Sequence, residues 1–82
     1  MLPDDEETST LVVQATEETW IRIQDDNKEA FQVLLRAGEK ITHKAARFNV
    51  DLGNAGGVRI AFNGKNIENL GKSGQVIHLR LP

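Results

Sequence analysis

The chain has 82 residues, no cysteine and a formal net charge of −2 at pH 7. This length fits a single domain with a thin core, because so short a chain buries only about 60% of its unfolded surface. The lack of cysteine excludes a disulfide framework and any cysteine-based metal site. No apolar run approaches the roughly 18 residues of a membrane span, and no signal-peptide pattern is present.

The acidic residues are concentrated at the start of the chain, where Asp4, Asp5, Glu6 and Glu7 have no basic neighbour. Beyond them lie ten basic residues and the other eight of the twelve acidic ones. These charges are too dispersed for a nucleic-acid surface, so we expect no nucleic-acid partner. We expect residues 1–9 to form an acidic disordered linker or tail, and residues 10–82 to form one β domain.

Alternating apolar and polar residues predict strands along most of the chain. The predicted strands are residues 10–16, 19–24, 31–36, 40–44, 47–52, 58–62 and 76–81. Residues 66–75 are expected to form an irregular loop. Seven short strands with turn residues between them predict an all-β fold, a small antiparallel β-sandwich or barrel. We expect residues 10–16 and 40–44 to be edge strands, which are either protected or open for the addition of a partner strand.

Two of these strands, residues 19–24 and 31–36, can be placed in register from their side chains. One register matches every pair in character. It pairs Ile23 with Phe31, Ile21 with Val33, Arg22 with Gln32 and Trp20 with Leu34. A slip of one residue would send the two apolar sets to opposite faces, so this register is well specified.

This register places Trp20 and Leu34 together on a face that also carries Arg22 and Arg36. Aromatic and arginine side chains of this kind are typical of interface hot spots. The four residues are therefore our candidate partner-contact site. The alternative is that Trp20 shields the sheet, covered by the tail, the first strand or the 66–75 loop.

The segment from Leu52 to Lys65 is the architectural centre of the predicted fold. It reads as a strand end, a glycine-rich turn, a strand and a tight turn. The first turn holds Gly53, Asn54, Gly56 and Gly57, which tolerate a positive φ and let the chain reverse. Asn63-Gly64 is a strong hairpin signal, and Gly38 marks a further turn.

No motif in the chain indicates catalysis, a cofactor or a metal. Residues 70–73, Leu-Gly-Lys-Ser, resemble the end of a phosphate-binding loop, but Asn66 stands where the motif needs glycine. His43 and His78 are the only histidines, and no spacing supplies further zinc ligands. The serines lack a base at a recognisable spacing. We expect no catalytic residue, no cofactor and no metal, and thus no enzyme.

Several segments in this order resemble the C-terminal domain of RodZ-like bacterial proteins. They are residues 19–23 (Thr-Trp-Ile-Arg-Ile), 34–39 (Leu-Leu-Arg-Ala-Gly-Glu), 48–52, 53–58 (Gly-Asn-Ala-Gly-Gly-Val) and 63–65 (Asn-Gly-Lys). The resemblance covers residues 10–81. It implies a single-pass, membrane-anchored cell-shape protein, whose cytoplasmic helix-turn-helix domain contacts the actin-like MreB filament. Neither that domain nor the membrane helix is among the 82 residues, so the resemblance implies the end of a longer chain.

The resemblance further implies a non-catalytic scaffold on the outer, periplasmic side of the cytoplasmic membrane. Its expected partners are cell-envelope or cell-wall-synthesis proteins, with membrane contact only through the upstream helix. A second hypothesis is a peptidoglycan- or glycan-binding β domain, because Trp20 stands near polar and arginine side chains. Sugar sites usually use more than one aromatic residue, and this chain has no tyrosine.

Overall fold

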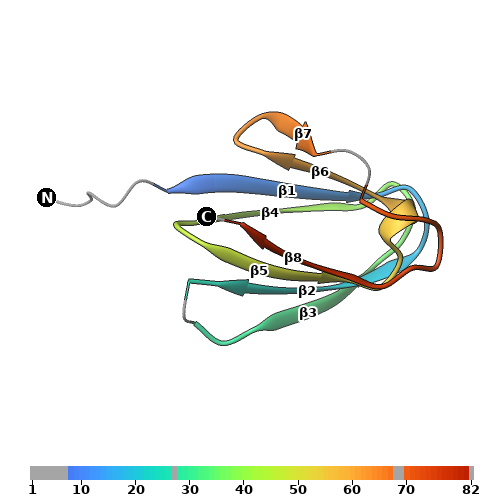
Figure 1. Ribbon diagram of the computed structural model, residues 1–82, viewed down its shortest axis with the longest axis horizontal. Coiled ribbons are helices and arrows are strands. Elements are labelled where there is room, and N and C mark those ends of the chain that lie inside the picture. Colours follow the sequence, from blue (N-terminus) through green and yellow to red (C-terminus); the bar gives the residue numbers. More distant parts are fainter. Residues whose placement is uncertain (1–7, 27, 68–69, 82) are drawn as a thin grey trace, which may run out of the picture.

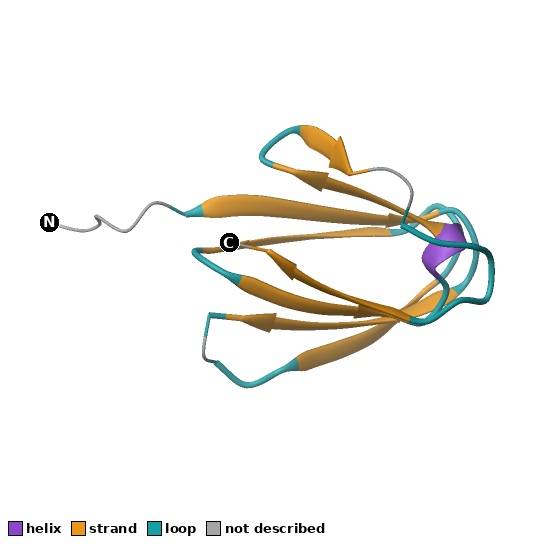
Figure 2. Ribbon diagram, viewed as in Figure 1, coloured by secondary structure: helices purple, strands orange, loops and turns teal. Residues whose placement is uncertain are grey.

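The structure is a computed structural model that describes residues 8–26, 28–67 and 70–81. Eight strands in these ranges form two four-stranded antiparallel sheets, which pack face to face (Figures 1 and 2). The strands are β1 (Ser9–Ala15), β2 (Thr19–Asp25), β3 (Phe31–Leu35), β4 (Lys40–Ala45), β5 (Phe48–Leu52), β6 (Val58–Phe62), β7 (Lys65–Ile67) and β8 (Ile77–Leu81). The predicted all-β fold is confirmed; of the two expected architectures, sandwich or barrel, the structure has the sandwich, with one strand more than expected.

The strand order is β4-β1-β6-β7 in the first sheet and β3-β2-β5-β8 in the second. The chain therefore changes sheet between β1 and β2, at Glu17 and Glu18. The expectation that residues 10–16 form an edge is wrong, because β1 pairs with β4 on one side and β6 on the other. β4 is an edge strand, as expected. Most of the predicted linker lies outside the described residues, and its last residue, Ser9, already begins β1.

The additional strand, β7, follows the Asn63-Gly64 turn. Both turn residues have positive φ, 53° at Asn63 and 84° at Gly64, which is the backbone of a type I′ hairpin. The hairpin returns the chain along β6 for three residue pairs. A strand this short, with Lys65 and Asn66 both exposed, shows no apolar alternation, so its sequence reads as loop.

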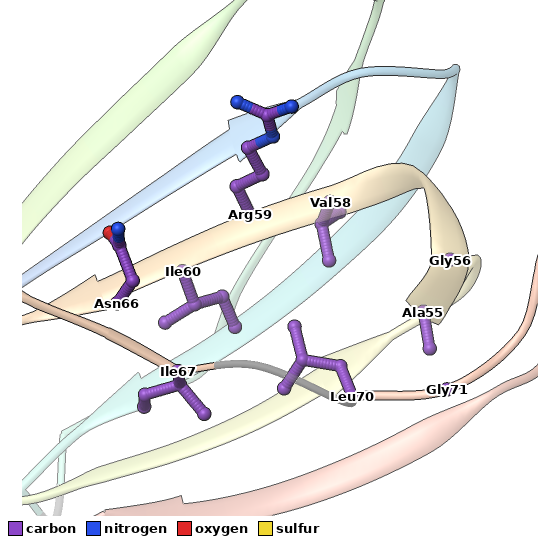
Figure 3. Close-up of a pocket in the computed structure, with 9 residues that line it drawn as sticks. All are labelled: Ala55, Gly56, Val58, Arg59, Ile60, Asn66, Ile67, Leu70 and Gly71. Atoms are coloured by element: carbon purple, nitrogen blue, oxygen red, sulfur yellow. The ribbon is translucent and has the colours of Figure 1, made fainter.

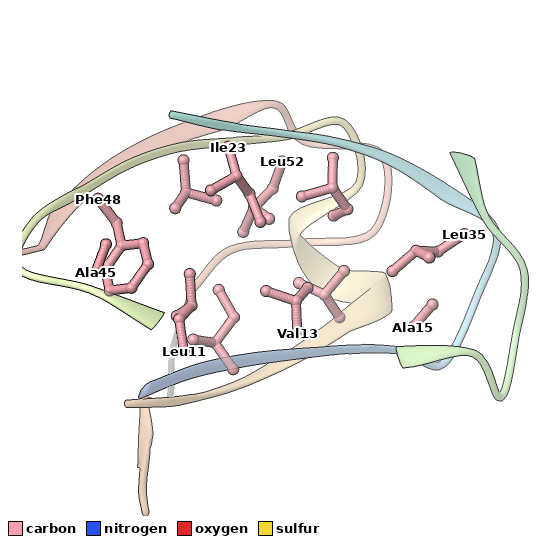
Figure 4. Packing of buried hydrophobic residues seen from close by; sticks show 12 residues of the cluster. Leu11, Val13, Ala15, Ile23, Leu35, Ala45, Phe48 and Leu52 are labelled. Carbon is pink, nitrogen blue, oxygen red and sulfur yellow. The ribbon is translucent and has the colours of Figure 1, made fainter. Parts of the chain in front are cut away.

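The core lies between the two sheets, where the inward side chains of both meet (Figure 4). The buried apolar cluster comprises Leu11, Val13, Ala15, Ile21, Ile23, Leu35, Ala45, Phe48, Val50, Leu52, Val58 and Ile60. All of them occupy alternating strand positions, which is why the period-2 pattern finds them. Phe48 is fully buried and meets Phe62 edge to face, with ring centroids 6.2 Å apart. Each large side chain buried here contributes about 1.5–3 kcal/mol.

The predicted register of β2 and β3 is confirmed at every pair. Trp20 lies opposite Leu34, Ile21 opposite Val33, and Ile23 opposite Phe31. Phe31 nevertheless remains 44% exposed, since it begins an edge strand. Its ring packs against His43 of β4, with centroids 5.4 Å apart.

The glycine-rich segment closes one end of the sandwich, where Ala55–Gly57 form a single 3₁₀ turn. Our reason for its glycines was wrong: Gly53, Gly56 and Gly57 do not have a left-handed φ, and neither does Asn54, at −147°. The requirement is for space. A Cβ on Gly56 would lie 2.2 Å from the backbone nitrogen of Ser73. Positive φ is found instead at Gly38 and Gly64, as predicted for turn glycines.

Candidate interaction face

An apolar row crosses the outer face of the second sheet. Leu34 on β3 lies opposite Trp20 on β2. The next position along the row is Gly53, whose N–H donates to the carbonyl oxygen of Trp20 (2.9 Å). If the β5–β8 register is continued by one residue pair, Val76 lies opposite Gly53. Leu34 is 55% and Val76 61% exposed, so the row presents apolar surface to solvent at both ends.

The indole of Trp20 is seated on the backbone of Gly53. A Cβ built on Gly53 would stand 2.2 Å from Nε1 of Trp20 and 2.4 Å from Cε2, so the ring occupies the space of the missing side chain. Trp20 is partly buried, with Leu34 exposed beside it. The ring packs on the turn at Gly53, a contact that neither alternative from the sequence named, and part of it remains exposed on the face.

A polar hollow of about 420 Å³ lies beside this row on the same face. Its walls come from β2, β5, β8 and the residue before β3. The lining residues are Arg22, Gln24, Ala30, Asn49, Asp51, His78 and Arg80. Two arginines against one carboxylate make the hollow cationic at neutral pH. Asp51 is hydrogen-bonded to Nδ1 of His78, which fixes the one carboxylate in place.

The structure brings three of the four predicted contact residues together. Trp20 and Leu34 are direct neighbours, and Arg22 follows on β2 at the rim of the hollow. Arg36 lies just beyond the end of β3, where its backbone N–H donates to Oε1 of Glu39 (2.8 Å). A role for these four residues in partner contact stays a prediction.

Sequence reasoning missed Val76 and most of the hollow. The signal was present, since the hollow is lined by outward positions of β2, β5 and β8. Extending the correct β2–β3 register across β5 and β8 would have found them. The role of Gly53 as a seat had no sequence signal, because its contact with Trp20 spans 33 positions of the chain.

Neither hollow found among the described residues pairs a nucleophile with an acid or base. The polar hollow contains no hydroxyl, thiol or lysine that could act as a nucleophile. Within the same described ranges, no group of three His, Cys, Asp or Glu residues could hold a metal ion. A second hollow, of about 480 Å³, lies between β6 and Leu70 (Figure 3). Its lining is apolar or glycine except for Arg59 and Asn66, so it offers no acid or base.

A hydrogen-bonded cluster braces the end of the sheet next to Trp20. Oε1 of Glu17 accepts from the side chains of Asn54 and Ser73, both at 3.0 Å. Oδ1 of Asn54 accepts the N–H of Gly74 at 2.7 Å. The bond from Asn54, and then that from Ser73, lowers the pKa of Glu17. The cluster ties three separate connections together and so fixes the turn that begins at Gly53.

Comparison with protein-family models gives a match to the RodZ C-terminal domain over residues 12–80. The chain belongs to the RodZ C-terminal domain family. The matched range begins within β1 and ends within β8, so it includes both sheets and the whole candidate face. Comparisons with curated proteins and with solved structures give no match.

In this RodZ C-terminal domain, then, the apolar row and the polar hollow share the outer face of one sheet. The resemblance inferred over residues 10–81 is confirmed by a match of nearly the same extent. Among the described residues, the structure has no helix of the length and apolar character that crossing a membrane requires.

Proposed function

We propose that this RodZ C-terminal domain is a non-catalytic docking module of a membrane-anchored cell-shape protein. It acts on the outer side of the cytoplasmic membrane and helps to couple the MreB filament to cell-wall synthesis. Its partner is a protein of the cell envelope or of the wall-synthesis machinery. Family membership supports the cell-shape role, and the outer face supports the docking role.

The observation that carries the docking proposal is the apolar row from Leu34 to Val76. The side chains of Leu34 and Val76, each more than half exposed, lie on either side of Trp20, and arginines lie nearby. Protein interfaces have this anatomy: an aromatic anchor and apolar neighbours in the centre, with arginine and polar groups at the rim.

The docking proposal is tested in the cells that make the protein, with the native chain carrying Leu34→Asp. Leu34 is exposed, so the domain should fold, while a charge on the apolar row should abolish docking. Thr42→Asp, on the exposed side of β4 in the other sheet, is the matched control. We expect rounded or widened cells only with Leu34→Asp, at equal protein levels. Normal shape with both variants would refute a docking role for this face.

The proposed location has its own test, because a chain without cysteine can be given a unique label. Thr42→Cys in the native protein should react with a membrane-impermeant maleimide once the outer membrane, where there is one, has been permeabilised. Reaction only after lysis of the cytoplasmic membrane would contradict the proposed location.

A second candidate function is binding of peptidoglycan, which the polar hollow favours. Planar amide and guanidinium groups beside a partly exposed indole suit a glycan with carboxylate-bearing peptide stems. Soluble muropeptides should then shift the amide NMR signals of Arg22, Asn49 and His78. A spectrum unchanged by muropeptides would exclude this function and leave the protein partner.

A further inference from the structure

The two sheets have four edge strands, and three of them carry basic side chains. β4 carries Lys40, His43 and Lys44, β7 carries Lys65, and β8 carries His78 and Arg80. Charges, above all lysine, are a common protection of an edge against pairing with another strand. β3 differs from the other three: its sequence, Phe-Gln-Val-Leu-Leu, has no ionisable group and no proline.

The open edge of β3 also has backbone groups ready to pair. Within an antiparallel pair, alternate residues direct their N–H and C=O toward the neighbour. The backbone of Trp20 is hydrogen-bonded to Gly53, on the β5 side, so the backbones of the alternate residues Thr19, Ile21 and Ile23 face β3. Their partners on β3 are Leu35, Val33 and Phe31. The backbones of Gln32 and Leu34 therefore point away from β2. In the described part of the chain β3 is hydrogen-bonded to β2 alone, and it forms the lower margin of the sandwich in Figure 1.

We propose that this edge pairs antiparallel with β3 of a second copy of the chain, with Val33 on the two-fold axis. In this register Gln32 of each copy lies opposite Leu34 of the other. Each such pair exchanges two backbone hydrogen bonds, four in all. The β3-β2-β5-β8 sheets of the two copies then form one continuous eight-stranded sheet.

Charge favours a second copy as the occupant. The five residues of β3 bring no like charges together when the strand meets itself. Just outside them, Arg36 follows one end of β3 and Glu29 lies before the other, and both are exposed. Antiparallel pairing about a two-fold axis brings the end with Arg36 of each copy beside the end with Glu29 of the other. The other three edges carry basic side chains, which repel one another in any register that places them opposite each other.

The inference does not depend on the proposed function, because strand pairing uses the edge and leaves the outer face open. The paired sheet would present two apolar rows on one surface. A partner with two equivalent sites would then bind through both at once, with a gain in avidity.

Sedimentation of the 82-residue chain from micromolar to millimolar concentration tests the proposal. We expect reversible dimerisation that Gln32→Pro weakens by more than about tenfold, because the proline removes two of the four hydrogen bonds. The substituted N–H points away from β2, so the fold should be kept; Gln32→Thr is the control and should dimerise like the native chain. A chain monomeric at all concentrations, or a dimer indifferent to Gln32→Pro, would overturn the proposal.

A cross-linking measurement covers the case in which the proline variant fails to fold. In a two-fold pair, the Cβ atoms of residue 33 from the two copies face each other within disulfide reach. Val33→Cys should therefore form a disulfide-linked dimer on mild oxidation, whereas Thr42→Cys on the β4 edge should not. Equal cross-linking by the two variants, or none by Val33→Cys, would mean that β3 pairs with a strand of another protein or with none.

Discussion

Replacing Gly53 by alanine should destabilise the domain through Trp20. The new methyl group would stand 2.2 Å from Nε1 of the indole, far inside contact distance. The φ of Gly53 lies outside the left-handed region, so alanine suits the backbone and the clash is the only obstacle. The ring must therefore leave its seat and expose the face that now packs on the glycine.

The expected cost follows from the area uncovered. A tryptophan side chain buries roughly 150–250 Å² on folding. If the seated face accounts for about 100 Å² of it, its loss costs about 2.5 kcal/mol at about 25 cal/mol per Å². Alanine returns about 0.4–1 kcal/mol by restricting the unfolded chain. The net loss is about 2 kcal/mol, which lowers Tm by about 8–16 °C in a domain of this size.

The assay is a double-mutant cycle with Trp20→Ala, read by urea denaturation. Once the indole is absent, Gly53→Ala should be neutral or stabilising, so the sign of its effect reverses. In the native background, the emission of Trp20, the chain's one tryptophan, should also shift to the red. Equal destabilisation in both backgrounds would refute the seat and point to the backbone of the turn.

Three further predictions concern the fold. Because the pKa of Glu17 is lowered in the folded state, its carboxylate stabilises the fold at any pH above its ordinary pKa of about 4.5. This contribution is lost as the pH falls through the pKa of the folded state. Stability measured in urea at acid pH should therefore fall more steeply in the native chain than in Glu17→Gln. Phe48→Ala should cost about 3–5 kcal/mol and leave little folded protein by circular dichroism, whereas Leu34→Ala should change stability by about 0.5 kcal/mol or less. Gly64→Ala should cost about 1–2 kcal/mol in the same denaturation assay, because alanine is strained at φ 84°.

The alternating pattern was sufficient to predict the β class, the inward side chains and the β2–β3 register. These properties depend on neighbours in sequence or on a hairpin. The position of β1 inside its sheet depends on pairing with β6, 43 to 51 positions away, which no local pattern encodes. β7 was missed because it is too short to show a period.

The candidate face was predicted only in part, for the same reason. Trp20, Leu34 and Arg22 follow from one hairpin register, while Val76 and the hollow need strands brought together from three parts of the chain. The glycines at 53 and 56 were assigned to the turn correctly but for the wrong reason. A steric demand made by Trp20 or Ser73 is visible only in three dimensions.

The central position of β1 has a mechanical consequence. A pull that enters the domain at Ser9 acts along β1, whose two ladders to β4 and β6 run parallel to the force. The strand can leave only by sliding past both neighbours at once, so the hydrogen bonds of both ladders share the load. An edge strand in the same place would be held against the pull by the hydrogen bonds of one ladder only. A pull applied at Ser9 is thus borne by a strand that is held on both sides.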